Sequence, residues 1–307
     1  MNQGWIMAAI FGGINLCQAH IFGEDSRIDA FEIQSSFWRE KSKAVVAIRK
    51  KGVFNRNPHL QSLSIKHALK TLKEEKNLCS GESFEFQYSL SECSGVLVAP
   101  DLVLTAGHCV KDHPCNGKGI EVYTDFEISD PHSSLQKLHR DQSHACIRKI
   151  HTEYPLLNGT NYMGGQDIAL IQISPPIKDR NPVSIDYVGS FEPQASVRAM
   201  GFPSGIPLKQ SRGFFKGISA PNQMIWTDVD TVKGSSGSPL FKESDGNLIG
   251  IITLSDQKKA YQKKKYSKCS RLIDCEKENC KMWNSANSLH SISKVLQREI
   301  ALSKLRN

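Results

Sequence analysis

The sequence predicts an all-β protein of the barrel or sandwich type, with a helix at its C-terminal end. Short apolar runs recur along the chain, and clusters of Gly, Pro, Asp or Asn separate most of them. Alternating βαβ units would instead place long helical patterns between the strands. The last stretch, residues 288–305, spaces its apolar side chains as one face of a helix does.

The expected strands are short and rich in Val, Ile and Leu. They are residues 44–48, 95–98, 102–105, 120–123, 168–173, 195–200, 224–226 and 248–254. Residues 52–78 are polar and rich in Lys with some helical spacing, so we interpret them as an insertion on a β framework. No internal repeat recurs at a fixed period.

The composition favours an exported globular protein. The 307 residues are 39% hydrophobic and 23% charged, which excludes a disordered or fibrous chain. Nine cysteines indicate an oxidising compartment. The formal charge of +8 is concentrated in Lys258–Lys281, which holds nine Lys or Arg against three acidic residues. This segment predicts contact with an anionic surface, although a solvated loop is the simpler interpretation, and we expect no nucleic-acid partner.

The first 19 residues predict a cleaved export signal. They carry no charged side chain, have an apolar centre from Trp5 to Leu16, and end in the small residues Cys17 and Ala19. The stretch is too short and too interrupted by Gly for a membrane span. Loss of Cys17 leaves eight cysteines, an even number that permits complete pairing. We therefore expect a secreted or periplasmic bacterial protein.

Three segments carry residues suited to nucleophilic catalysis. Leu104–Cys109 reads LTAGHC at the end of a strand, Gln166–Ile171 reads QDIALI at the start of one, and Gly234–Pro239 reads GSSGSP. A serine hydroxyl needs a histidine base to take its proton. That histidine needs an acid to fix its tautomer and to stabilise its charged form.

The candidate base, acid and nucleophile are His108, Asp167 and Ser236. The oxyanion of a tetrahedral intermediate needs backbone N–H donors, here those of Gly234 and Ser236. Singly, each segment has a simpler interpretation as a structural histidine, a turn aspartate or a flexible turn. Together, in this order and at separations of 59 and 69 residues, they point to one catalytic site.

These segments resemble the trypsin/chymotrypsin superfamily, whose members carry TAGHC, DIAL and GxSGxP around the three residues. Ser238 and the run Gly201–Pro203 are similar to the bacterial glutamyl-endopeptidase branch. The resemblance covers residues 43–256 and implies two packed six-stranded antiparallel β-barrels with the active site between them. It also implies a disulfide between Cys93 and Cys109, closing the loop behind the histidine.

The chain is expected to divide into an export signal, an N-terminal arm and two barrels. After the export signal, residues 20–42 are expected to form a pro-segment or an N-terminal arm. Residues 43–180 form the first barrel, with His and Asp of the triad and the insertion at 52–78. Residues 181–307 form the second barrel, with the nucleophile, a basic segment containing cysteines at 257–281 and the C-terminal helix.

Substrate preference is expected to depend on Asp230. The residue six before the nucleophile forms the base of the primary specificity pocket in trypsin-like enzymes, where a carboxylate attracts Arg or Lys. In the glutamyl-endopeptidase branch, Thr231 would help to bind Glu, but the His of that branch is absent from Gly250–Thr253. The resemblance therefore favours Arg or Lys over Glu, with Thr253 and Ser255 near the pocket.

One departure concerns activation. Ser235 stands where trypsin-like enzymes carry an Asp that pairs with a newly cut N-terminal amine. A serine hydroxyl cannot form that ion pair, so we expect any activation to work differently.

The other six cysteines allow 15 pairings, and the sequence does not choose among them. They are Cys79, Cys115, Cys146, Cys269, Cys275 and Cys280. The spacing of the last three does not fit a zinc site, and no HExxH segment is present, so we expect neither a metal nor another cofactor.

Three functions are compatible with these residues. A serine endopeptidase acting on protein or peptide substrates uses all three candidate residues. An esterase would use the same chemistry, but the order of the residues and the missing GxSxG segment argue against an α/β-hydrolase. A binding protein on a peptidase scaffold would use the basic segment instead. The first is favoured, as a monomer.

Overall fold

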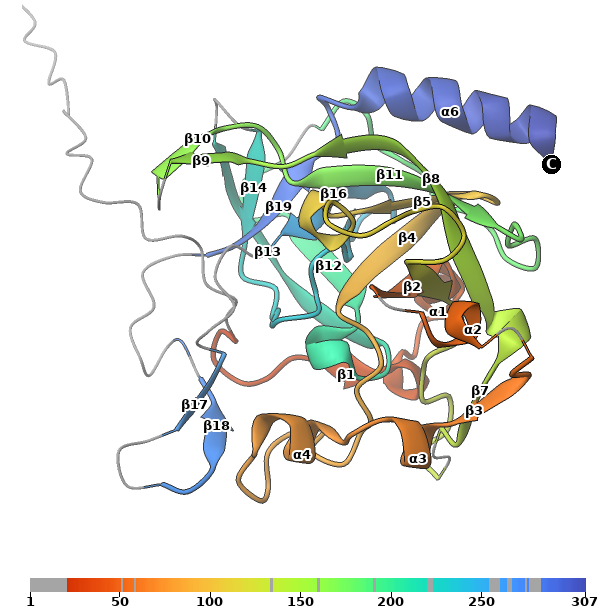
Figure 1. Cartoon of the computed structure of the whole chain (residues 1–307). Coiled ribbons are helices and arrows are strands. Elements are labelled where there is room, and N and C mark those ends of the chain that lie inside the picture. The colour runs from red at the N-terminus through yellow and green to blue at the C-terminus, as the bar shows by residue number, and fades with distance from the viewer. Residues whose placement is uncertain are drawn as a thin grey trace, which may run out of the picture.

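The computed structural model describes residues 21–50, 52–57, 59–132, 135–158, 161–189, 192–219, 223–253, 260–263, 267–273, 275 and 283–307. The predicted export signal, Ser255 and much of Lys258–Lys281 lie outside this part of the chain. Two β-barrels lie side by side, and a C-terminal helix lies along the outside of the first (Figure 1). The expected fold class is confirmed.

The first barrel is a closed ring of six antiparallel strands. In ring order they are β11 (Ile168–Ser174), β5 (Leu102–Thr105), β4 (Cys93–Ala99), β2 (Val45–Arg49), β6 (Glu121–Tyr123) and β8 (Ser143–Glu153). All residues of β4, β5 and β6 are buried, which explains their apolar runs in the sequence. A disulfide between Cys115 and Cys146 ties β8 to the loop before β6.

The second barrel has a ring of six strands and one added edge strand. In ring order the six are β13 (Lys209–Ser219), β12 (Ser196–Gly201), β15 (Pro239–Lys242), β16 (Leu248–Thr253), β19 (Asn284–Ser288) and β14 (Met224–Thr227). Pairing of β14 with β13 closes the ring. The edge strand β1 (Ile28–Asp29) pairs with the start of β13.

Eight of the twelve ring strands were expected from apolar runs in the sequence, and four were not. The expected runs correspond to β2, β4, β5, β6, β11, β12, β14 and β16. The expectation missed β8, β13, β19 and the four-residue β15. The first two are 11 residues long and mix buried with exposed positions, and β19 has the sequence NSANS yet is wholly buried.

Residues 21–43 are built into the second barrel. They form β1, the short helix η1 (Ala30–Glu32) and the helix α1 (Ser36–Lys43). Trp38 of α1 is 5% exposed, and the Arg198 guanidinium lies 4.4 Å from its ring centroid. Phe241 of β15 packs against the same ring. Ile33 and Trp38 of this polar stretch therefore belong to the core, whereas Phe37 is exposed.

The insertion contains α2 (Val53–Arg56), β3 (Ser62–Ser64), α3 (Ile65–Ala68) and α4 (Leu72–Lys76). In Figure 1, α3 and α4 form a layer below the barrels, whereas α2 lies beside the first barrel, close to α1. Phe54 and Ile65 pack in the same apolar core as the strands of the first barrel. β3 pairs with β7 (Lys137–His139), which the short helix η3 (Arg140–Gln142) follows. A disulfide from Cys79 to Cys269 joins this layer to the hairpin of β17 (Tyr261–Lys263) and β18 (Ser270–Leu272). A further small hairpin is made by β9 (Leu156–Asn158) and β10 (Asn161–Gly164).

The C-terminal helix α6 (Ser293–Arg306) is anchored by one buried carboxylate. Asp101, in the turn between β4 and β5, accepts hydrogen bonds from Ser303 and from Arg306, the latter at 2.8 Å. Burial raises the pKa of Asp101, but hydrogen bonds from Arg306, Ser303 and Gln172 outweigh it and hold that pKa below its usual value. None of the helices in the described residues is long and apolar enough to cross a membrane.

Asp101→Ala is expected to lower the free energy of unfolding by about 2 kcal/mol, because it removes charge-assisted bonds and leaves buried donors unpaired. A depressed carboxyl pKa stabilises the fold above the unfolded value of about 3.9, and this contribution is lost as pH falls through the folded pKa. The difference between variant and wild type should therefore shrink below about pH 4. Urea unfolding at several pH values measures it. A constant difference from pH 7 to pH 2 would contradict the ionic anchor.

Candidate active site

His108 and Asp167 are held together at the open end of the first barrel. β5 ends at Thr105 and β11 begins at Ile168, and the antiparallel register pairs Thr105 with Ala169. The residues just beyond these strand ends therefore face each other. The Asp167 carboxylate accepts from the His108 backbone N–H at 2.7 Å and lies 2.6 Å from His108 Nδ1. Both carboxylate oxygens thus orient the same histidine.

Gly107 permits this contact because no side chain fits at its position. It begins the short helix η2 (Gly107–Cys109). A Cβ there would lie 1.8 Å from the Glu153 carbonyl oxygen and 3.1 Å from Asp167 Oδ1. Any larger residue must therefore displace the strand end or the carboxylate.

A residue from the second barrel also holds Asp167. Asn287, buried in β19, donates from Nδ2 to the Asp167 carbonyl oxygen at 2.7 Å. Sequence reasoning missed it because β19 has no apolar periodicity. The sequence NSANS is polar apart from one alanine, so nothing in it marks Asn287 as buried. This bond joins the second barrel to the acid of the first.

Ser236 lies in the loop Asp230–Ser236, named here the Ser236 loop. The backbone carbonyl of Ser236 accepts a hydrogen bond from the Ser94 N–H of β4 at 2.7 Å, which places the loop against the first barrel. Ser236 is 0% exposed, and its Oγ has no hydrogen-bond partner among the described residues. The His–Asp pair is thus formed, whereas the serine hydroxyl is not yet hydrogen-bonded to His108. Such contacts often tighten only when substrate binds.

The Ser236 loop also orients a backbone donor. The Lys233 carbonyl accepts from the Ser204 N–H in the short helix η4 (Pro203–Gly205). Because the C=O and N–H of one trans peptide point in opposite directions, the Gly234 N–H faces away from Ser204. Gly234 has φ of +99°, and a Cβ there would lie 2.5 Å from the Phe202 carbonyl oxygen, so this orientation requires glycine.

Cys93 and Cys109 form a disulfide between β4 and η2. It spans the loop that carries His108, the arrangement that the resemblance implies. Because both sulfurs are bonded to each other, their closeness to His108 does not make a metal site. Cys275 is also disulfide-bonded, and Cys280 lies outside the described residues.

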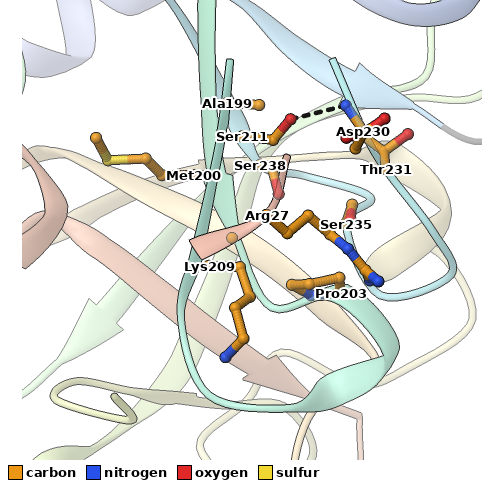
Figure 2. Close-up of a pocket in the computed structure, with 11 residues that line it drawn as sticks. Arg27, Ala199, Met200, Pro203, Lys209, Ser211, Asp230, Thr231, Ser235 and Ser238 are labelled. Atoms are coloured by element: carbon orange, nitrogen blue, oxygen red, sulfur yellow. Dashed lines mark hydrogen bonds between the residues drawn. The ribbon is translucent and has the colours of Figure 1, made fainter. Parts of the chain in front are cut away.

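The residues expected to bind substrate do not form one cluster. Asp230 and Thr231 are buried and line a cavity of about 10 Å³, together with Arg27, Ser235 and Ser238 (Figure 2). Thr253 ends β16 and accepts a hydrogen bond from Ser285 through its carbonyl, but it does not line this cavity.

Asp230 contacts the N-terminal part of the chain. Its carboxylate accepts from Phe22 N–H at 2.7 Å, from Ser26 N–H at 2.7 Å and from Ser26 Oγ at 2.5 Å. Burial raises the pKa of Asp230, and these hydrogen bonds oppose that shift. A role at the base of a specificity pocket would require a substrate to reach the one acceptor site that these three donors leave on the carboxylate.

The model of the trypsin-like peptidase domain matches residues 93–251, just over half of the 307-residue chain. The chain belongs to the trypsin-like peptidase family. The match spans the three segments that contain His108, Asp167 and Ser236, and it ends within β16. No characterised protein with a curated description matches the whole sequence.

Solved structures include similar chains at low identity. The serine endoprotease from Yersinia pestis is similar with a TM-score of 0.49 and 17% identity, over 88% of this peptidase and 68% of that chain. Deg5 is similar with a TM-score of 0.47 and 16% identity, over 87% of this peptidase and 93% of that chain. Likenesses this distant indicate no substrate.

Gly107→Ala is expected to lower the free energy of unfolding by about 2 kcal/mol, the usual cost of forcing extra atoms into a packed site. Urea unfolding measures the loss. Gly117→Ala is a matched control, because a Cβ at Gly117 meets no atom within 4 Å, although its positive φ adds backbone strain. Equal stability of Gly107→Ala and wild type would contradict the close approach of Glu153 and Asp167.

Proposed function

We propose that this peptidase is a serine endopeptidase, with His108, Asp167 and Ser236 as its catalytic triad. The observation that carries the proposal is the pair of bonds from one Asp167 carboxylate to the backbone and ring of His108. This geometry fixes the tautomer in which Nε2 is free to accept a proton. The Ser236 loop, with glycines on both sides of the serine pair, packs on the same end of the first barrel.

The reaction follows from these roles. Ser236 Oγ attacks the carbonyl carbon of the scissile peptide bond, and His108 Nε2 takes the hydroxyl proton. The N–H groups of Gly234 and Ser236 donate to the oxyanion. Collapse of the intermediate breaks the C–N bond, and His108 gives its proton to the leaving amine. Water then attacks the acyl-enzyme with His108 again as base, releasing the acid and restoring Ser236.

Specificity for Arg or Lys before the scissile bond is the preference we propose, through Asp230. A carboxylate has about four acceptor sites, and Phe22 and Ser26 occupy three of those on Asp230. A basic side chain would bind at the remaining site on Oδ1. Glutamate preference, typical of the glutamyl-endopeptidase branch, has less support because no His stands in Gly250–Thr253. Thr231, Thr253 and Ser255 are the further residues proposed to border the substrate.

Secretion or periplasmic export is part of the proposal. The disulfides Cys79–Cys269, Cys93–Cys109 and Cys115–Cys146 support an oxidising compartment. We also propose a monomer, and contact of Lys258–Lys281 with an anionic surface such as a bacterial envelope.

A non-catalytic binding protein is the second candidate. The buried Ser236 hydroxyl without a hydrogen-bond partner favours it. The hydrogen-bonded His108–Asp167 pair argues against it, because a binding protein has no need for an oriented base beside a serine.

Ser236→Ala and His108→Ala are each expected to lower kcat for peptide hydrolysis by about 10⁴-fold or more. The measurement uses a peptide panel that varies only the residue before the scissile bond. Ser303→Ala is the matched control, because it removes a buried hydroxyl on α6, away from the site, and should keep kcat within about twofold. Hydrolysis that survives Ser236→Ala would sink the proposal. Cleavage after Glu would reject the Asp230 assignment alone, and no cleavage by wild type would favour the binding scaffold.

A further inference from the structure

The N-terminal segment (Ile21–Asp29) follows the second barrel beside the Ser236 loop. Its end, β1, pairs with β13 through Ile28 opposite Gln210. Its start packs in an apolar cluster with Val232 of the Ser236 loop and with Ala260. The Ile21 carbonyl accepts from the Cys275 N–H at 2.8 Å. The segment is therefore attached at both ends.

Between these ends, the segment supplies three hydrogen-bond donors to the Asp230 carboxylate. Two of them are backbone N–H groups and the third is the Ser26 hydroxyl. Ser211 of β13 completes the group: it accepts from the Asp230 N–H at 2.7 Å and lies 3.1 Å from Ser26 Oγ. Because Asp230 is buried and begins the Ser236 loop, these bonds fix one end of that loop.

Arg27 lines the same cavity as Ser235, near the other end of the Ser236 loop. Its side chain is 1% exposed and makes two bonds of 2.7 Å to Asp25. Arg27 Nη1, Thr231 Oγ1 and Ser238 Oγ are buried without hydrogen-bond partners, and their residues line one cavity (Figure 2). At about 10 Å³, the cavity has room for one water molecule, which these three polar groups would hold.

A buried ion pair keeps the segment in register. Lys209 is 2% exposed, and its Nζ donates to the Asp29 carboxylate at 2.6 Å and to the Gln87 side-chain oxygen at 2.7 Å. Asp29 is the last residue of the segment, and Gln87 belongs to the chain that follows the insertion. Removing either charge would leave the other unpaired in the interior, so this end of the segment is costly to detach.

We propose that the N-terminal segment positions the Ser236 loop for catalysis, with Ser26 as a positioning residue that acts through Asp230. This inference rests on the proposed function. Within the loop, Ser235 and Val232 form a turn: the Ser235 N–H donates to the Val232 carbonyl at 2.9 Å, and the Val232 N–H donates to Ser235 Oγ at 3.3 Å. This turn does not include Asp230, where the loop begins. The N-terminal segment restrains that end from outside, by hydrogen bonds to Asp230 and by the side chains of Ile21 and Arg27.

The test compares Ser26→Ala with Ser26→Thr in the full chain, using kcat and KM for the preferred peptide. Ser26→Ala removes the hydroxyl bond to Asp230 and should lower kcat about tenfold, the worth of one bond to a charged group. KM should stay within about twofold, because the loss is in the fraction of molecules with a competent loop. Ser26→Thr keeps the hydroxyl and should recover most of kcat.

Hydrogen–deuterium exchange of the Ser236 loop provides a second readout that does not depend on turnover. Exchange of amides 232–236 should rise about tenfold in Ser26→Ala. Ser303→Ala is the matched control, since it also removes a serine hydroxyl bonded to a buried carboxylate, Asp101. It should leave both kcat and loop exchange unchanged.

The outcomes separate the two proposals. Wild-type kcat and loop exchange in Ser26→Ala would overturn the positioning role. An equal fall of kcat in Ser26→Ala and Ser303→Ala, with unchanged loop exchange, would also overturn it. Turnover that does not depend on Ser236 would overturn the proposed function, while loop exchange would still decide whether the segment holds the loop.

Discussion

The contact made by Ser94 joins the two barrels where the segments of His108 and Ser236 meet. Its N–H donates to the Ser236 carbonyl, and its Oγ donates to the Gly234 carbonyl at 2.9 Å and accepts from the Phe202 N–H at 2.9 Å. Thr105, just before the histidine segment, donates to the Ser94 carbonyl at 2.7 Å. One fully buried serine thus ties the loop of the second barrel to the two strands that place His108. If the barrels moved apart, His108 and Ser236 would separate.

The sequence predicted the fold where burial follows a simple rule. Strands such as β5 and β11 are buried along almost their whole length, so their side chains are almost all apolar. β8 and β13 have exposed residues among buried ones, and β19 buries amides and hydroxyls that bond across the barrel. Asn284 Nδ2, for example, donates to the Val229 carbonyl at 2.7 Å. Such burial depends on tertiary partners, which propensity and periodicity do not reveal.

The candidate site was open to sequence reasoning for a similar reason. His108, Asp167 and Ser236 stand in local segments whose order and chemistry make them candidates, and that assignment stays a prediction. The residues that contact them have no such local signal: Asn287 bonds Asp167 across 120 residues, and Ser26 bonds Asp230 across 204. The polar stretch at 20–42 is predicted from sequence to be a pro-segment or an arm. Nothing in it indicates that its residues donate hydrogen bonds to Asp230, the first residue of the Ser236 loop.

The central claim is that Ser236 is a nucleophile activated by His108, and covalent labelling tests it most directly. The full chain would be treated with a fluorophosphonate, and the modified peptide identified by mass spectrometry, with His108→Ala treated in parallel. We expect one phosphonyl group per chain on Ser236, and almost none in His108→Ala. Labelling of a different residue, or equal labelling of Ser236 without His108, would contradict the account.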